Sequence, residues 1–178
     1  NHKNAKKLIS LFENAYLSNN NLSDATRYLV NQLFGEYGLV IIDGDDKDLK
    51  KQFIPLIKKD VLESGFAADL NECSDRLARN YKAQAFVRNI NFFRIIDGTR
   101  ELIKGGVTHQ EIEENPEQFS PNVLLRPVFQ EFILPNIAYV GGESELSYWM
   151  QLKTLFDKEK IPFPILVLRK SALLTDEK

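Results

Sequence analysis

The stretch Ser120–Leu174 reads SPNVLLRPVFQEFILPNIAYVGGESELSYWMQLKTLFDKEKIPFPILVLRKSALL. It contains two short apolar runs, Asn136–Val140 and Phe163–Leu168, which Pro or Gly bounds as in many buried strands. Between them, Ser144–Lys160 has no Gly or Pro and carries apolar residues on a wide helical face. The stretch therefore predicts a βαβ unit, in which a helical crossover joins two parallel strands.

The Gly141-Gly142 pair stands where the first strand should end and the helix should begin. In open α/β sheets ligands bind outside the carboxyl ends of the strands, and glycine lets a ligand approach the backbone closely. Ser144 follows in the first helical turn, where Glu143 and Glu145 would repel a phosphate but attract an ammonium group. The alternative is a plain tight turn, because a lone Gly-Gly pair is weak evidence for a site.

Composition bounds the class of protein. The 178 residues are 43% hydrophobic and 27% charged, with a formal net charge of −2, as in an ordinary soluble domain. This balance gives no broad electrostatic footprint for nucleic acid, and no apolar run is long enough to span a membrane. The single cysteine, Cys73, excludes an internal disulfide and fits a reducing cytoplasm, which is the expected location.

A third strand is predicted nearer the start of the chain. Gly38–Asp43 reads GLVIID, a continuous apolar run typical of a strand covered on both faces, so Leu39–Asp43 should run parallel to the other two strands. Asp43, Asp45 and Asp46 cluster at its carboxyl end, where they could bind a metal, a ribose hydroxyl or a substrate amine. Alternatively, Asp45 or Asp46 caps the next helix and the others are solvated.

The middle of the chain predicts two helices and a hairpin. One helix covers Lys47–Glu63 and should break at Pro55, and the other covers Leu70–Asn89. Ile90–Ile96 and Thr99–Ile103 are joined by Asp-Gly, a strong β-hairpin signal, and we interpret this hairpin as an insertion in a parallel sheet.

Cations follow the same strand ends. Arg126 precedes the βαβ unit, and Arg169, Lys170 and Ser171 follow its last strand, so an arginine there could clamp a carboxylate or phosphate. The alternative is a surface salt bridge. The sequence shows no Cys–His or Ser–His constellation and no metal-ligand spacing, so no metal site is predicted and the catalytic residues stay unassigned.

Several phrases of the sequence resemble the BshC family, the cysteine-adding ligases of bacillithiol biosynthesis in bacteria. They are LFGEYGLVIIDGDD, KAQAFVRNINFFRIIDGTRELI, SPNVLLRPVFQEFILPNIAYVGGESELSYWMQLKTLFD and PFPILVLRKSALL, and together they cover nearly the whole chain. The resemblance implies an α/β fold: a Rossmann-like, partly parallel sheet with flanking helices and an inserted helix and β-hairpin segment. We assign residues 1–64 and 120–178 to the core and residues 65–119 to the insertion.

The resemblance also implies a reaction. Family members would join cysteine to glucosaminyl-malate, with ATP activating a carboxylate and Mg²⁺ as a further candidate cofactor. The family's glycine-rich first strand and its C-terminal coiled coil, which would pair two subunits in a homodimer, are absent here. The chain is therefore expected to be the middle of a longer protein and to be inactive alone.

The family's strand-end motifs fall on residues already singled out: Asp43, Asp45, Gly141, Gly142, Glu143, Ser144, Arg169 and Ser171. The two glycines would allow close approach of a ligand, in particular a nucleotide. Asp43 or Glu145 would hold the cysteine ammonium, Arg126 or Arg169 a carboxylate, and Tyr148 either reaches the pocket or packs beneath it. The alternative function is a non-catalytic α/β nucleotide-binding or assembly module.

Overall fold

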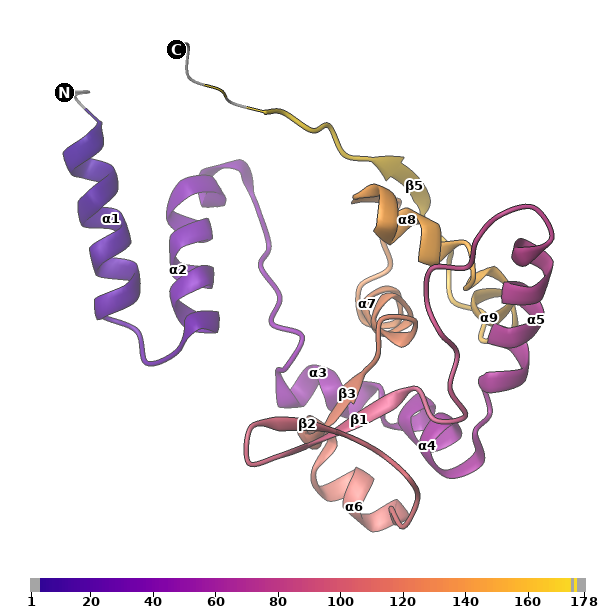
Figure 1. Cartoon of the computed structure of the whole chain (residues 1–178). Helices are drawn as coiled ribbons and strands as arrows, with labels where there is room; N and C mark the ends of the chain where they lie inside the picture. Colours follow the sequence, from indigo (N-terminus) through magenta and orange to yellow (C-terminus); the bar gives the residue numbers. More distant parts are fainter. Residues whose placement is uncertain (1–3, 174, 176–178) are drawn as a thin grey trace. The chain divides into compact units, whose positions relative to one another are not determined.

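The structure, a computed structural model, describes residues 4–173 and 175. Its contacts divide the chain into two compact units, one ending at Gly44 and the other beginning at Asp45 (Figure 1). Each unit is described by itself. The predicted division at residues 64 and 119 concerns core and insertion rather than contacts, and it stays a prediction.

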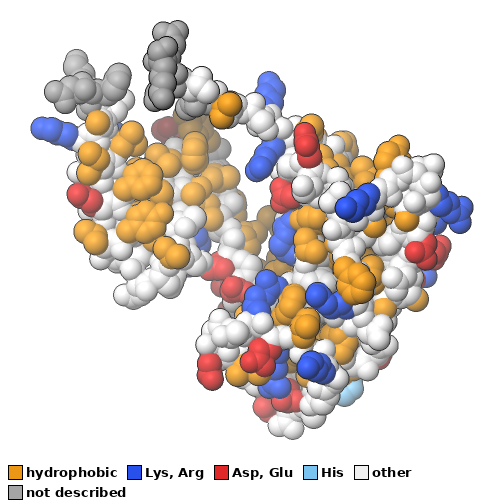
Figure 2. All heavy atoms as spheres, in the orientation of Figure 1, with side chains coloured by type: hydrophobic (Ala, Val, Ile, Leu, Met, Phe, Trp, Pro, Cys, Tyr) orange, Lys and Arg blue, Asp and Glu red, His pale blue; other side chains and the backbone are white. Residues whose placement is uncertain are grey.

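The first unit is a helical hairpin. Its elements are α1 (Ala5–Leu17), α2 (Leu22–Phe34) and the short 3₁₀ helix η1 (Gly35–Tyr37). Asn21 caps α2 by accepting the backbone N–H of Asp24 at 2.9 Å. The two α-helices bury only Ala15, Ala25 and Leu29, and they leave large hydrophobic side chains exposed, which Figure 2 shows in orange.

The predicted third strand is wrong. Leu39–Asp43 has no strand assignment, and among the described residues no strand pairs with it. Val40 is 75% exposed, so the apolar run is not covered on two faces. A strand of this kind needs hydrogen-bonded neighbours as well as an apolar sequence, and the run finds none in the described part of the chain.

The second unit begins with three helices: α3 (Lys47–Gln52), α4 (Ile54–Glu63) and α5 (Ala67–Ala78). The predicted break at Pro55 is confirmed, because the proline occupies the first turn of α4, where its missing N–H costs nothing. Asp46 caps α3 by accepting the backbone N–H groups of Asp48 and Leu49.

The predicted hairpin is confirmed. Strands β1 (Phe92–Ile96) and β2 (Thr99–Leu102) pair antiparallel across Asp97 and Gly98, whose φ angles are 48° and 75°. The short strand β3 (Phe119–Pro121) adds to the other edge of β1 and gives the order β2-β1-β3. Helix α6 (His109–Glu114) and the 3₁₀ helix η2 (Pro116–Gln118) connect the hairpin to β3.

The predicted βαβ unit is also confirmed in its strands. After α7 (Leu125–Ile133), strands β4 (Ala138–Gly141) and β5 (Ile165–Leu168) form a parallel pair. The single helix predicted between them is wrong: the chain forms α8 (Glu143–Trp149) and α9 (Lys153–Lys158).

Buried Gln151 lies at the break between these two helices. Its contacts also explain why the predicted helix Leu70–Asn89 is shorter in the structure. Its side chain accepts the backbone N–H groups of Gln84 and Ala85 and donates to Ala85 O. Gln84 and Ala85 thus find hydrogen-bond partners outside a helix, and the predicted helix Leu70–Asn89 ends at Ala78.

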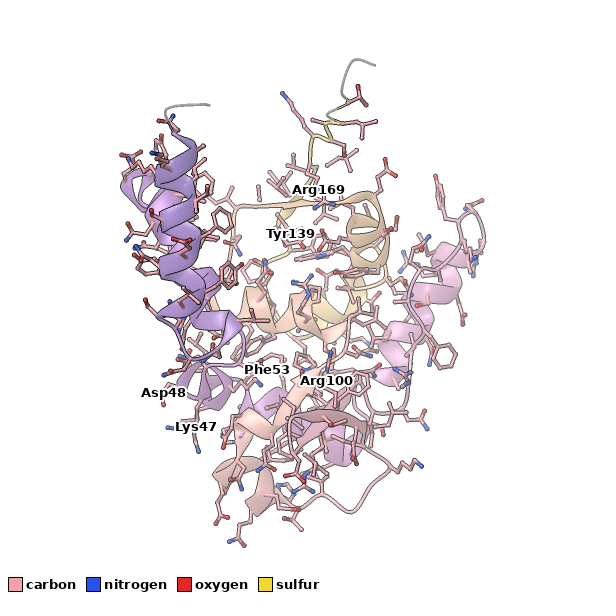
Figure 3. All side chains as sticks on the ribbon, turned by 60° about the vertical axis from the view of Figure 1, so that its left-hand side comes forward. Lys47, Asp48, Phe53, Arg100, Tyr139 and Arg169 are labelled. Carbon is pink, nitrogen blue, oxygen red and sulfur yellow. The ribbon has the colours of Figure 1, made fainter. Side chains whose placement is uncertain are left out.

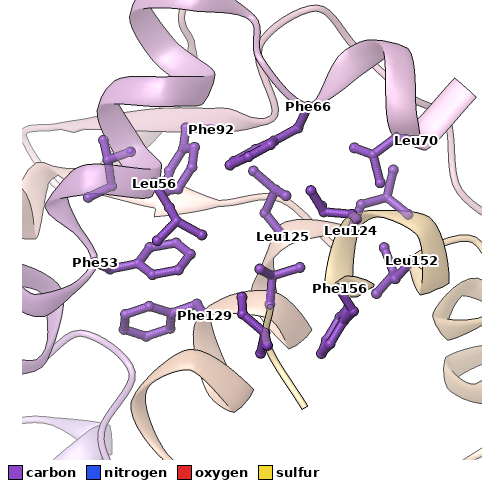
Figure 4. Packing of buried hydrophobic residues seen from close by; sticks show 14 of the residues in the cluster. Phe53, Leu56, Phe66, Leu70, Phe92, Leu124, Leu125, Phe129, Leu152 and Phe156 are labelled. Atoms are coloured by element: carbon purple, nitrogen blue, oxygen red, sulfur yellow. The ribbon is translucent and has the colours of Figure 1, made fainter. Parts of the chain in front are cut away.

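One hydrophobic cluster holds the second unit together (Figure 4). Phe53, at the junction of α3 and α4, packs edge-on against Phe129 of α7 with ring centroids 4.9 Å apart. Phe66, Phe92 and Phe156 join the same cluster and are almost fully buried. The cluster packs α7, α8 and α9 against α3, α4 and α5, and so it positions the turn after β4.

Candidate functional site

A cavity of about 760 Å³ opens at the carboxyl ends of β4 and β5. Its lining consists of Gly142, Glu143, Ser144, Glu145, Leu168, Arg169 and Ser171. Six of these seven residues are among the sequence-predicted site residues, and the parallel pairing of β4 with β5 brings them together. The backbone N–H of Arg169 donates to Gly141 O at 2.9 Å, which fixes the segment after β5 beside the turn after β4.

At Gly142 the absence of a side chain permits a close approach of Arg169, and the backbone is not left-handed. Its φ of −75° is open to any residue. A Cβ atom at this position would lie 3.3 Å from Nη2 and 3.4 Å from Cζ of Arg169. The guanidinium group therefore packs directly on the Gly142 backbone, and a larger residue would displace it.

Gly141 leaves space for the aromatic ring of Tyr139. A Cβ atom there would lie 2.6 Å from Cε1 of Tyr139 and 3.1 Å from Cδ2 of Leu146. The Tyr139 ring in turn stacks on Trp149 with centroids 4.5 Å apart. The space beside Gly141 thus serves packing of the protein itself, and the predicted close approach of a ligand at Gly141 stays a prediction.

Glu145 anchors the turn. Its Oε2 accepts the Gly142 N–H at 2.9 Å and its Oε1 accepts the Tyr139 hydroxyl at 3.0 Å. The bond from the Gly142 N–H, then the Tyr139 hydroxyl, and then the charges of Arg126 and Arg169 lower the pKa of the Glu145 carboxyl. Burial raises the pKa of the Tyr139 hydroxyl, which therefore stays a donor.

Arg126 and Tyr148 lie behind the turn and not in the cavity lining. Tyr148 is buried, and its hydroxyl accepts a hydrogen bond from Nη2 of Arg126 at 2.7 Å. The same Nη2 lies 3.4 Å from the Tyr139 hydroxyl and 3.8 Å from Oε1 of Glu145. The alternative that Tyr148 packs beneath the pocket is therefore supported, and the contacts of Arg126 reach the turn through Tyr139 and Glu145.

Arg169, labelled in Figure 3, is exposed and lines the cavity. Among the residues that the structure describes, its guanidinium takes part in no hydrogen bond and no ion pair. Glu143 and Ser144, in the first turn of α8, and Ser171 are also exposed. The cavity thus offers one guanidinium, two hydroxyl groups and two carboxylates, a set that suits a ligand with both an anionic and a cationic group.

The three aspartates of the predicted cluster have other contacts in the structure. Asp43 belongs to the first unit, where its carboxylate accepts the Ser23 hydroxyl. Asp45 pairs with Nζ of the buried Lys50 at 2.8 Å, and Asp46 serves as the cap of α3. The capping alternative is therefore confirmed for Asp46, and neither Asp45 nor Asp46 lines the cavity.

The sequence prediction missed Leu168 of the lining and Tyr139, whose hydroxyl binds Glu145. Side chains alternate along a strand, so residues 139 and 141 lie on the same face of β4. In a strand, an aromatic residue two positions before a glycine therefore predicts that its ring packs on that glycine.

The described part of the chain offers neither a metal site nor a membrane-spanning helix. There, no three His, Cys, Asp or Glu side chains gather in a way that could hold a metal ion. None of the helices described is both long enough and apolar enough to cross a bilayer.

Comparison with known proteins gives the family. A family model described as "Bacillithiol biosynthesis BshC, N-terminal Rossmann-like domain" matches residues 1–170. A protein of Flavobacterium psychrophilum is 46% identical over an alignment of 191 positions. The alignment covers 98% of this chain and 36% of the relative. A protein of Flavobacterium johnsoniae is 44% identical with the same coverage, and one of Staphylococcus aureus is 27% identical over 83% of the chain.

All three relatives carry the name "Putative cysteine ligase BshC". The chain spans 36% of the length of the two Flavobacterium proteins. The matched family model covers almost the whole sequence, and the parallel strands with their helical crossover agree with a Rossmann-like domain. The chain therefore belongs to the BshC family and corresponds to its N-terminal Rossmann-like domain.

Proposed function

We propose that the complete protein that carries this chain is a ligase that adds cysteine to glucosaminyl-malate to form bacillithiol, with ATP activating a carboxylate. We further propose that the cavity beside Gly142 is part of its ligand site. The observation that carries this proposal is the gathering of Gly142, Glu143, Arg169 and Ser171 around one cavity at the strand ends, where α/β proteins bind ligands.

The charges of the cavity suggest a role for each side chain. Arg169 is suited to bind an anionic group of a substrate, because its guanidinium forms no hydrogen bond and no ion pair with the described residues. Glu143, exposed at the start of α8, is suited to bind an ammonium group such as that of cysteine. The hydroxyl groups of Ser144 and Ser171 would orient the bound ligand.

ATP fits this cavity under one condition. Glu143 and Glu145 would repel the phosphates, whereas Arg169 would attract them. Magnesium would remove the conflict, because Mg²⁺ is commonly held by one or two carboxylates together with substrate phosphates and needs no complete protein cage. Arg169 and Glu143 would then hold the magnesium nucleotide, as an alternative to the anionic group and the ammonium group named above.

A non-catalytic nucleotide-binding or assembly module is the second candidate. The observation that favours it is that two predicted site residues, Gly141 and Glu145, have structural roles. Gly141 leaves space for the Tyr139 ring, and Glu145 accepts the hydrogen bond of the Gly142 N–H. Such a module would bind ATP without turnover, so binding and turnover must be measured separately.

The test uses the complete protein and the variant Arg169→Ala. With ATP, Mg²⁺, cysteine and glucosaminyl-malate, the wild type should form bacillithiol, detected by mass spectrometry, and the variant should lose at least tenfold in kcat/KM. The control is Lys170→Ala, which removes an exposed charge at the next residue, outside the cavity lining.

Wild-type turnover with equal rates for both variants would place the ligand site elsewhere. A wild type that gains thermal stability with ATP but forms no product would favour the non-catalytic module. We also propose that the complete protein works as a cytoplasmic homodimer on these small molecules, without nucleic acid or membrane. Sedimentation of the complete protein would test the dimer.

A further inference from the structure

Glu145 lies between two arginines that come from different elements. Arg126 of α7 approaches it from the protein side, with Nη2 3.8 Å from Oε1. Arg169, which follows β5, lies in the cavity lining with Glu145, and its guanidinium packs on Gly142. Because Glu145 also holds the Gly142 N–H, both cations surround one short turn.

The contacts on the Arg126 side are numerous. Its two terminal nitrogens donate to the hydroxyls of Tyr148 and Tyr139 and to Oε1 of Gln130 at 2.7, 3.4 and 3.3 Å. The Tyr139 hydroxyl accepts from Arg126, so its own proton is directed to Glu145 at 3.0 Å. Arg126 and Tyr139 together hold the carboxylate toward the protein.

The contacts on the Arg169 side are few. Within the described residues its guanidinium makes no hydrogen bond and no ion pair, although Glu145 lines the same cavity. An unpaired arginine beside a carboxylate would ordinarily close an ion pair with it. The contacts from Arg126, Tyr139 and Gly142 explain why this carboxylate is already engaged.

We infer that Arg126 is a positioning residue: it holds Glu145 on the protein side of the turn and so leaves the Arg169 guanidinium available for a carboxylate or phosphate of the ligand. The inference rests on the proposed ligand site and adds to it the residue that keeps the site open. Without Arg126, the nearest available cation for Glu145 would be Arg169, and the new ion pair would occupy the group that binds the anion.

The experiment compares Arg126→Gln with the wild type in the complete protein. The KM for one anionic substrate should rise about tenfold, because a charge-assisted contact to it is lost, while kcat changes less. Measuring KM separately for cysteine, glucosaminyl-malate and ATP distinguishes a carboxylate from a phosphate as the bound group. Arg100→Gln, the same change at an exposed arginine of β2, serves as the control and should leave all three values unchanged.

A double variant separates this role from a general structural one. In Arg126→Gln/Glu145→Gln no carboxylate competes for Arg169, so the raised KM should fall back toward the value of Glu145→Gln alone. A crystal structure of Arg126→Gln should show Arg169 within ion-pair distance of Glu145. Arg126→Met, which keeps an apolar stem without charge, replaces the glutamine variant if that one fails to fold.

The inference is overturned if folded Arg126→Gln keeps all three KM values, or if the second substitution brings no recovery. If the wild type forms no bacillithiol at all, the proposed function fails, and the crystal structure alone then decides about Arg126. A Glu145 side chain that stays in place in that structure, with Arg169 unpaired, would show that Arg126 does not hold it.

Discussion

Protonation of Asp60 should contribute stability to the fold in mild acid, and this contribution should be lost at neutral pH. The residue lies in α4 with no exposed surface, and its carboxylate accepts the backbone N–H and the side-chain amide of Asn91. No ion pair among the described residues includes it. Burial raises the pKa of Asp60 from 3.8 to about 6, although the two bonds from Asn91 act in the opposite direction.

The magnitude follows from these two pKa values. They differ by about two pH units, and each unit corresponds to about 1.4 kcal/mol, so the ionised carboxylate costs the folded state about 3 kcal/mol. Because the pKa is higher in the folded state, that state binds more protons between pH 3.8 and pH 6. The stabilisation is therefore fully present below pH 3.8 and is lost as the pH rises through about 6.

The assay is urea unfolding of the wild type and of Asp60→Asn at pH 7 and at pH 4. The asparagine stays neutral, so the free energy of unfolding of the wild type should rise relative to that of the variant by about 2 kcal/mol between pH 7 and pH 4. Other carboxyl groups titrate in both proteins and cancel in this difference. Asp157→Asn, at an exposed aspartate of α9, is the control and should show no such change.

Parallel pH profiles for wild type and Asp60→Asn would refute the reasoning, because they would mean that Asp60 has similar pKa values in the folded and unfolded states. A profile with the opposite slope would mean that the bonds from Asn91 outweigh burial.

Three further outcomes are expected. Gly141→Ala should lower the free energy of unfolding by about 1–3 kcal/mol, because its Cβ would lie 2.6 Å from the Tyr139 ring; an unchanged urea midpoint would contradict this packing. Asp46→Ala should cost about 1 kcal/mol by removing the cap of α3, whereas the adjacent exposed Lys47→Ala should cost less in the same assay. The 178-residue chain alone should form no bacillithiol from ATP, cysteine and glucosaminyl-malate, because aligning two substrates requires walls on several sides; product above a no-enzyme control would disprove this.

Local signals predicted much of the second unit. The Asp-Gly turn of the hairpin, the break at Pro55 and the cap at Asp46 each depend on neighbouring residues and backbone angles, and the structure confirms all three. The two apolar runs bounded by Pro and Gly predicted the parallel pair of β4 and β5. Because parallel strands place their carboxyl ends at one edge, the sequence also brought Gly142, Arg169 and Ser171 to a common site.

Predictions that needed distant partners were less successful. The run Leu39–Asp43 has the composition of a buried strand, but composition cannot supply the neighbouring strands that such a strand requires. Residues 79–91 have helical periodicity in part, yet Gln151 binds the backbone of Gln84 and Ala85, and Asn91 binds that of Arg88, outside a helix. The contacts of Gln151 join residues up to 67 positions apart, and no local pattern encodes them.

The sequence by itself thus determined the family, the βαβ unit and the residues around the turn after β4, since these follow from apolar periodicity, turn chemistry and motif order. Only the tertiary structure decided what those residues do to one another. It placed Tyr139 in the space that Gly141 leaves, set Arg126 behind Glu145 and left Arg169 facing the cavity. The physical reason is that hydrogen bonds and ion pairs depend on distances of a few ångströms between side chains, and packing of α7 and α8 in the common core sets those distances.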